Sequence, residues 1–319
     1  MDLLPASLAL EGLSLEARRD FRCFNTDVAI QLTDWRWSHL LAQVEAFFHR
    51  FESRFSRFLP DSELTRFNRR QTPSVAVSDD MLDLLEECLC RYDATGGVFN
   101  PLVLENLEAA GYDASFEQLA ATTKSLTAQT PPPRLTCLKL DAARGTASLP
   151  LGLRLDFGGI GKGYAVDFAA SLLDEAGSYL VDAGGDIYAA GRAPDGGYWT
   201  IDVANPALPG TRLDVVALSN QAIATSWTTL RRWKRHGAWA HHLIDTRTGL
   251  PAESGVVGST VIASRAVDAD VFAKCALILG PNHGVAFLEA RGAPGLLVLE
   301  DGSIRTTNAW PSAEPNTEV

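Results

Sequence analysis

The 319-residue sequence has few cysteines, no long apolar run and fewer basic than acidic residues. There are five cysteines, an odd number, and no two of them form a Cys-x-x-Cys pair. Neither a disulfide framework nor a zinc site is therefore indicated. The apolar stretch 271–279 is too short to span a bilayer and contains Lys274. With 28 basic and 39 acidic residues the net charge is -11, which disfavours general binding to nucleic acid or anionic membranes.

The N-terminal sequence also lacks the features of an export signal. Asp2 stands where a signal peptide has Lys or Arg, and Pro5 interrupts the short apolar run. Cys23 follows Phe21 and Arg22 rather than the small residues of a lipoprotein cleavage site. The sequence therefore predicts a cytoplasmic protein without a membrane anchor.

A composition of 46% hydrophobic and 21% charged residues is typical of a soluble globular protein, and the length allows a large core. We expect a mobile lead-in at residues 1–20, a single domain of two closely packed halves at 21–310, and a tail at 311–319.

Hydrophobic spacing predicts helices and strands throughout this domain. Apolar residues at intervals of three and four predict a long helix from Trp37 to Phe55, and Ser78 is a good N-cap for a second. Further helices are expected at 166–173 and 268–279. Strands are expected at 22–32, 135–140, 146–149, 151–155, 179–183, 198–203, 213–218, 222–225, 258–263, 295–300 and 304–307. Because strands mostly follow strands, the pattern favours an α+β fold with mixed or antiparallel sheets.

The segment from Asp156 to Asp167 has the pattern strand, glycine turn and helix. Its glycines let backbone amides approach an anion, and Lys162 adds a positive charge at the helix N-terminus. The segment is not a Walker A loop, because Gly163 follows Lys162 where Ser or Thr is needed. On these residues alone, a phosphate site and a simple tight connection with a solvated lysine remain equally open.

Seven segments in matching order resemble the ApbE-type FAD:protein FMN transferases. The resemblance spans roughly residues 22–307, at 56–68, 97–101, 156–167, 182–187, 224–226, 242–249 and 269–280. It implies a duplicated architecture with FAD in the cleft between the halves. It also implies transfer of FMN from FAD to a Thr or Ser hydroxyl of a target protein, with release of AMP. Such a reaction needs the phosphate held, its charge offset and the hydroxyl proton removed.

The resemblance also implies roles for single residues. His242 matches the proposed base, and its near-neutral pKa suits proton abstraction. Asp270 matches the main carboxylate ligand of Mg²⁺ and Gly159 a carbonyl ligand. The positions expected to bind FAD are Phe24, Thr26, Phe58, Val98, Phe99, Asn100, Asp156, Gly158, Lys162, Gly184, Gly185, Asp186, Thr225, Ser226 and Leu243.

Several of these positions depart from the family pattern. Lys274 stands where the family has Thr or Ser, one helical turn after the metal aspartate, and a protonated lysine cannot ligate a metal. Trp227 replaces a glycine, while Phe24, Phe58 and Asn100 replace Met, Tyr and Asp. A non-catalytic FAD-binding protein is therefore a second hypothesis, and a paralogue that has lost flavin a third.

Each candidate residue also has an ordinary structural interpretation. His242 could be a strand residue satisfied by Asp245, and Asp270 could cap the N-terminus of its helix. The basic patch at 231–235 is either a solvated face or a surface for an acidic target.

Overall fold

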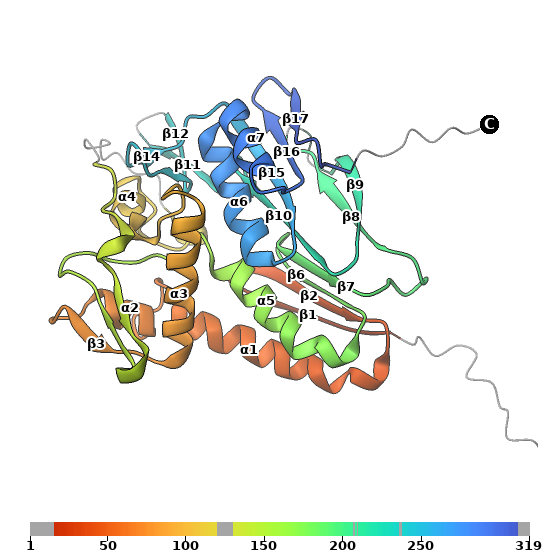
Figure 1. Cartoon of the computed structure of the whole chain (residues 1–319), viewed down its shortest axis with the longest axis horizontal. Helices are drawn as coiled ribbons and strands as arrows, with labels where there is room; N and C mark the ends of the chain where they lie inside the picture. Colours follow the sequence, from red (N-terminus) through yellow and green to blue (C-terminus); the bar gives the residue numbers. More distant parts are fainter. Residues whose placement is uncertain (1–15, 120–129, 207, 209, 236–237, 312–319) are drawn as a thin grey trace, which may run out of the picture.

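The computed structural model describes residues 16–119, 130–206, 208, 210–235 and 238–311 (Figure 1). Its main element is an antiparallel sheet in the order β1-β2-β6-β7-β10-β15-β16-β17. The described helices are α1 His39–Phe55, α2 Glu63–Asn68, α3 Asp79–Ala94, α4 Leu104–Ala109, α5 Gly161–Leu173, α6 Ala266–Leu279 and α7 Pro281–Glu289. The α+β prediction is confirmed.

The sheet strands are β1 Ala17–Cys23, β2 Thr26–Leu32, β6 Tyr179–Ala183, β7 Ile187–Ala190, β10 Gln221–Trp227, β15 Val256–Ala263, β16 Gly295–Leu299 and β17 Ile304–Thr306. The remaining described strands form small sheets: β3 Ser74–Ala76, β4 Lys139–Asp141, β5 Thr146–Ser148, β8 Trp199–Ala204, β9 Arg212–Leu218, β11 Arg232–Arg235, β12 Ala238–His241, β13 Ile244–Asp245 and β14 Leu250–Pro251.

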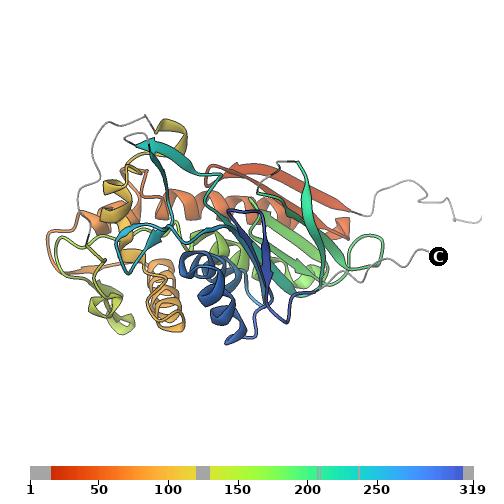
Figure 2. The ribbon, with the colours of Figure 1, turned by 90° about the horizontal axis from the view of Figure 1, so that it is seen from above.

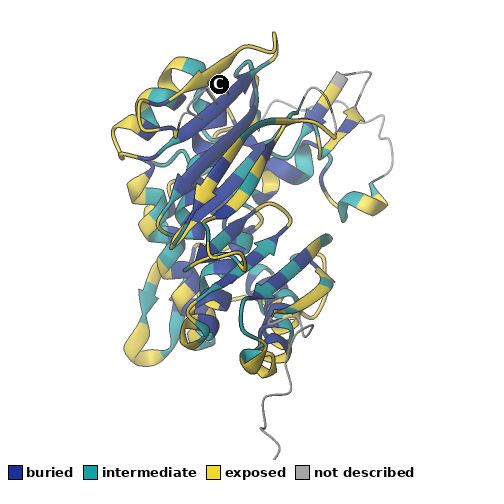
Figure 3. Cartoon of the chain, turned by 90° about the vertical axis from the view of Figure 1, so that its right-hand side faces the viewer, coloured by how far each residue is buried: buried dark blue, intermediate teal, exposed yellow. Residues whose placement is uncertain are grey.

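The central strands β7, β15 and β16 of the large sheet are buried on both faces, whereas β1 and β17 at its edges are largely exposed (Figure 3). Successive strand residues point to opposite faces. On β10, Ala222 and Ala224 belong to the core shared with α1, α5 and α6, whereas Ile223 packs with Trp199 and Val216 of the β8–β9 hairpin. The sheet therefore lies between a helical layer and this hairpin. Both described ends of the chain lie at the end of the molecule remote from α2, α3 and α4 (Figures 1 and 2).

Helices α5 and α6 approach each other closely at Gly163. A Cβ atom there would lie 2.7 Å from the carbonyl oxygen of Ala266 and 2.8 Å from Cα of Val267. The carboxylate of Asp167 on α5 accepts hydrogen bonds from the amides of Ala266 and Val267 and so caps α6. The contact brings Lys162 and Asp270 to one place in the fold.

The α1 helix confirms the predicted long helix, with Leu41, Val44 and Phe48 buried, although Trp37 lies in a short 3-10 turn before it. Ser78 caps α3 as expected, accepting a hydrogen bond from the amide of Met81. No helix among the described residues is long and apolar enough to cross a membrane.

The single strand expected at 22–32 is wrong, because β1 and β2 form a hairpin there. Phe24 and Asn25 both have positive φ, at 57° and 54°, and reverse the chain. Such values are unusual for a phenylalanine. The strand β1 begins at Ala17, inside the segment expected to be a lead-in. Residues 1–15 and 312–319 lie outside the described residues.

The expected strand at 151–155 is not present either, because side chains rather than a neighbouring strand satisfy its backbone. The Asn68 amide exchanges two hydrogen bonds of 2.8 Å with the backbone of Leu155. The Arg70 guanidinium donates to the carbonyl oxygens of Leu149, Pro150 and Leu153. The segment begins with a turn at residues 151–152 and is not part of any described sheet.

Candidate functional site

A cavity of about 500 Å³ is lined by segments from both the N-terminal and the C-terminal parts of the chain. It lies among the β1–β2 turn, the end of α1, the glycine turn before α5, and α6. Much of its wall is aromatic, with Phe51, Phe55, Phe99, Phe157 and Tyr112 among the lining side chains. A hollow of this size with an apolar wall and a few polar groups suits a small-molecule ligand.

Eleven of the residues expected to bind FAD, metal or substrate line this cavity: Phe24, Phe58, Val98, Phe99, Asn100, Asp156, Gly158, Gly159, Lys162, His242 and Leu243. Seven others do not line it: Thr26, Gly184, Gly185, Asp186, Thr225, Ser226 and Asp270. Some of these have clear structural roles. The Thr225 and Thr260 hydroxyls hydrogen-bond to each other at 3.0 Å, and Gly184, with φ of 66°, leaves room for Thr26.

At the glycine-turn end of the cavity, two lysines of the wall pair with two buried carboxylates that lie deeper in the protein. Lys162 forms an ion pair with Asp186, and Lys274 forms one with Asp270. The Asp186 and Asp270 side chains are 1% and 3% exposed, whereas Lys162 and Lys274 are among the lining residues. Both lysine side chains therefore reach the cavity wall, and the two carboxylates pair with them from inside the protein.

Burial and the neighbouring charges shift the pKa values of Asp186 and Lys162. Burial, and then the nearby Asp270 carboxylate, raise the pKa of Asp186 to about 6. Burial opposes the charge of Lys162, but the Asp186 and Asp270 carboxylates outweigh it and raise the pKa of the lysine. The Lys162 ammonium is therefore charged at neutral pH.

The donor set around Asp270 does not fit a divalent cation. One carboxylate oxygen contacts the Lys274 ammonium, and the other accepts a hydrogen bond of 3.4 Å from the amide of Gly163. The stem of Lys274 also runs beside the expected carbonyl ligand, since a Cβ atom on Gly159 would lie 3.9 Å from Cδ of Lys274. A lysine thus stands beside both positions expected to bind Mg²⁺.

Asp270 is not an N-cap, as its ordinary structural interpretation would require. The helix α6 begins at Ala266, so Asp270 lies in its second turn, and Asp167 caps the helix instead. The carboxylate is therefore free of a capping role and is engaged by the lysine.

Arg57 is a site residue that the sequence reasoning missed. Its guanidinium Nε lies 2.7 Å from Oδ2 of Asp156, and the two side chains are 7% and 10% exposed. Arg57 also lies over the rings of Phe58 and Tyr112, at 4.1 and 4.7 Å from their centroids. The other oxygen of Asp156 accepts a hydrogen bond from the amide of Gly158 and shapes the glycine turn. An arginine in the 56–68 segment indicates that an acidic partner lies nearby.

His242 is uncharged, and the near-neutral pKa expected for it from the sequence is wrong. Burial lowers the pKa of its imidazole to about 3, and Arg231, His241 and Lys274 add to the effect. Its Nδ1 atom is buried and has no hydrogen-bond partner among the described residues. Asp245 does not satisfy it, because that carboxylate pairs with Arg247 at 2.7 Å.

Two other departures from the family pattern, Trp227 and Asn100, have structural explanations. The ring of Trp227 lies against Gly258 on the paired strand β15. Because Gly258 has no side chain, it leaves room for the ring, and Trp227 does not line the cavity. The Asn100 side chain accepts from the amide of Leu102 and donates to the carbonyl of Pro133, and so fixes the loop that lines the cavity.

The basic patch is divided between the cavity and the surface. Arg231 lines the cavity. Arg232 and Lys234 lie over the exposed ring of Trp239, at 4.3 and 5.3 Å from its centroid. Arg232 and Lys234 are exposed, which agrees with either alternative for this part of the patch.

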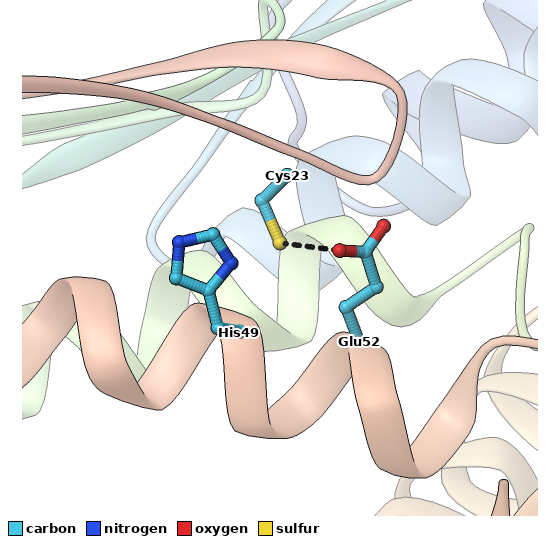
Figure 4. A group of neighbouring side chains, drawn as sticks. All are labelled: Cys23, His49 and Glu52. Carbon is cyan, nitrogen blue, oxygen red and sulfur yellow. Dashed lines mark hydrogen bonds between the residues drawn. The ribbon is translucent and has the colours of Figure 1, made fainter.

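Cys23, His49 and Glu52 gather beside the β1–β2 turn (Figure 4). The Cys23 thiol donates to the Glu52 carboxylate at 3.4 Å, and burial together with Glu52 raises the pKa of the thiol. The other oxygen of Glu52 accepts from the amide of Phe24 at 2.8 Å. Glu52 thus holds the strained turn in place, and the protonated thiol supports Glu52.

Comparison with known proteins identifies related sequences and a related structure. A sequence model of the ApbE family matches residues 24–297. The chain is 28% identical to the FAD:protein FMN transferase of Vibrio cholerae, over 82% of this chain and 79% of that protein. It is 30% identical to that of Treponema pallidum, over 77% and 73%. The ApbE protein of Thermotoga maritima superposes with a TM-score of 0.82 at 26% identity, covering 92% of this chain and 97% of that one.

Proposed function

This chain belongs to the ApbE family, and we propose that it is a FAD:protein FMN transferase, which moves FMN from FAD to a Thr or Ser hydroxyl of a target protein and releases AMP. The observation that carries the proposal is the placing of Lys162 and Lys274 at one end of an aromatic-lined cavity. A flavin dinucleotide has the matching chemistry, with aromatic rings joined through an anionic diphosphate.

The start of α5 supports the position of the diphosphate. The helix begins at Gly161 without a side-chain cap, and Gly158, Gly159 and Lys162 line the cavity there. Uncapped amides and the helix dipole favour an anion at such an end. The ammonium groups of Lys162 and Lys274 add full charges, and the aromatic wall offers apolar surface to the flavin.

The reaction forms one phosphoester bond and breaks one phosphoanhydride bond. The acceptor hydroxyl oxygen attacks the phosphorus of the FMN half, and AMP leaves with the bridging oxygen. The hydroxyl proton passes to a base, for which we propose His242, whose buried Nδ1 has no other partner among the described residues. Ammonium groups near the diphosphate offset the charge that develops on its oxygens.

The residues present do not fit the Mg²⁺ expected from the family resemblance. Its expected ligands, Asp270 and Gly159, lie beside Lys274, whose ammonium pairs with the Asp270 carboxylate.

The test is transfer to a flavoprotein that carries a Thr or Ser acceptor. The protein is incubated with FAD and the acceptor, with EDTA in one series and with Mg²⁺ in another. Covalent flavin is read by fluorescence in a denaturing gel and by mass, and AMP by chromatography. An acceptor with its Thr changed to Ala is the control. Absence of both products with an authentic acceptor in either series would overturn the proposal.

A second candidate, a non-catalytic FAD-binding protein, is favoured by the Lys274–Asp270 pair. It shares the first binding step and differs in the products. Saturable FAD binding without AMP release or covalent flavin would favour this candidate.

A further inference from the structure

We propose that the Lys274 ammonium is a built-in cation beside the diphosphate, so that this chain binds FAD without a divalent metal ion. The inference rests on the proposed function for the identity of the ligand. It concerns a different property, namely the source of the positive charge that faces the phosphates.

Lys274 already pairs with the carboxylate of Asp270. Its Nζ contacts Oδ1 of Asp270 and lies 3.3 Å from the backbone oxygen of the same residue. Oδ2 accepts the amide of Gly163. Every oxygen that Asp270 could offer to an ion thus has a protein donor close to it, and an incoming metal would have to displace the lysine.

The balance of charges at this site also disfavours a divalent ion. Among the described residues, the acids Asp186 and Asp270 are matched one to one by the ammonium groups of Lys162 and Lys274. Because these charges already cancel, a divalent ion added to this group would leave two positive charges unbalanced in a largely buried site, where an unbalanced charge is costly. An anion on the cavity side would instead meet the two ammonium charges first.

The position of the Lys274 side chain also favours a ligand on the cavity side. Lys274 lines the cavity, whereas Asp270 is 3% exposed and does not. The i,i+4 spacing on α6 holds the ammonium one turn beyond its partner. The side chain can therefore keep its pair with Asp270 while it faces a ligand.

The test is an FAD titration of the full chain in EDTA and in Mg²⁺, read by flavin fluorescence and by the protein's melting temperature. These readouts do not require transfer. We expect dissociation constants that agree within about twofold in the two buffers, and Mn²⁺ alone should give no calorimetric binding signal. FAD affinity that appears only with Mg²⁺ would overturn the inference and leave the proposed function standing.

The variant Lys274→Thr supplies the complementary result. It frees the Asp270 carboxylate and offers a hydroxyl, so we expect FAD binding in EDTA to weaken by about tenfold or more and Mg²⁺ to restore part of it. Lys162→Met is the matched control. It removes the other cavity ammonium but leaves Asp270 paired, so affinity should fall without gaining a response to Mg²⁺.

Folding of each variant is checked by circular dichroism. If Lys274→Thr fails to fold, Lys274→Gln keeps a hydrogen-bond donor for Asp270 while it removes the charge, and the same loss in EDTA is expected. Unchanged FAD affinity in a folded Lys274 variant would overturn the inference. If the parent protein binds no FAD in either buffer, the proposed function fails as well.

Discussion

The guanidinium Nε of Arg57 lies 2.7 Å from Oδ2 of Asp156, and both side chains are almost fully buried in the cavity wall. The pair joins the segment after α1 to the glycine turn before α5. Because Asp156 also accepts the Gly158 amide, the arginine holds the acid that shapes the turn. Stability of the fold and shape of the site therefore depend on the same contact.

Replacing Arg57 with Met should lower the free energy of unfolding by about 3–5 kcal/mol, because it leaves the buried Asp156 carboxylate without its partner. Urea unfolding followed by circular dichroism measures the change. The matched control is Arg212→Met, which breaks an exposed pair with Asp202 and should cost less than about 1 kcal/mol. Similar losses in the two variants would show that burial of the pair does not matter.

The sequence predicted the regular parts of the fold well because their signals are local. The apolar spacing of α1 and the cap at Ser78 each depend on a few neighbouring residues. The strand expected at 151–155 failed because its backbone partners are the side chains of Asn68 and Arg70, far away in the chain. Local alternation cannot reveal such partners.

The candidate site shows the same division. The glycine turn and Lys162 were found from their pattern, and the structure places them at the cavity. Arg57 was missed because its meaning depends on Asp156, about a hundred residues later. The turn at Phe24 was missed because a phenylalanine with positive φ has no local turn signal, and it is Glu52 on α1 that holds it.

The contact between α5 and α6 gives a prediction about glycine. In Gly163→Ala, the new Cβ atom would meet backbone atoms of Ala266 and Val267 at 2.7 and 2.8 Å. The helices must separate, and we expect a loss of about 1–3 kcal/mol in the free energy of unfolding. Gly161→Ala, on the same helix, is the control. Its nearest neighbour would be a Phe51 ring carbon at 3.7 Å, so the change should be neutral or stabilising. A neutral Gly163→Ala variant would contradict the close approach.

The cysteines should differ widely in their reactivity with iodoacetamide. Cys90 is exposed, whereas Cys23, Cys88 and Cys275 are buried. Burial also raises the pKa of the Cys88 thiol, and that of Cys275 to about 12, which keeps both protonated and unreactive. Mass spectrometry of the native protein should find label on Cys90 first, and unfolding in guanidinium should make all sites react alike. Equal labelling of Cys88 and Cys90 in the native protein would show that this core is open.

His242 should make stability depend on pH. Burial lowers its folded-state pKa to about 3, while the unfolded imidazole titrates at about 6.5. Between these values the unfolded chain binds the proton and the folded chain does not, so this contribution is complete above pH 6.5 and is lost as the pH falls toward 3. Replacing His242 with Gln should therefore reduce the dependence of unfolding free energy on pH by up to about one proton per molecule.

Urea unfolding at pH 7.5, 6.5 and 5.5 measures this slope, and His39→Gln, at an exposed ring on α1, controls for the loss of a histidine.

The low pKa of His242 also predicts how the transfer rate depends on pH. If a neutral His242 accepts the hydroxyl proton, protonation of this imidazole will not slow transfer between pH 8 and 5, since it stays uncharged over that range. A fall in the transfer rate as the pH drops through 6.5 would contradict the low pKa. It would mean that the ring is open to water when the substrate is bound.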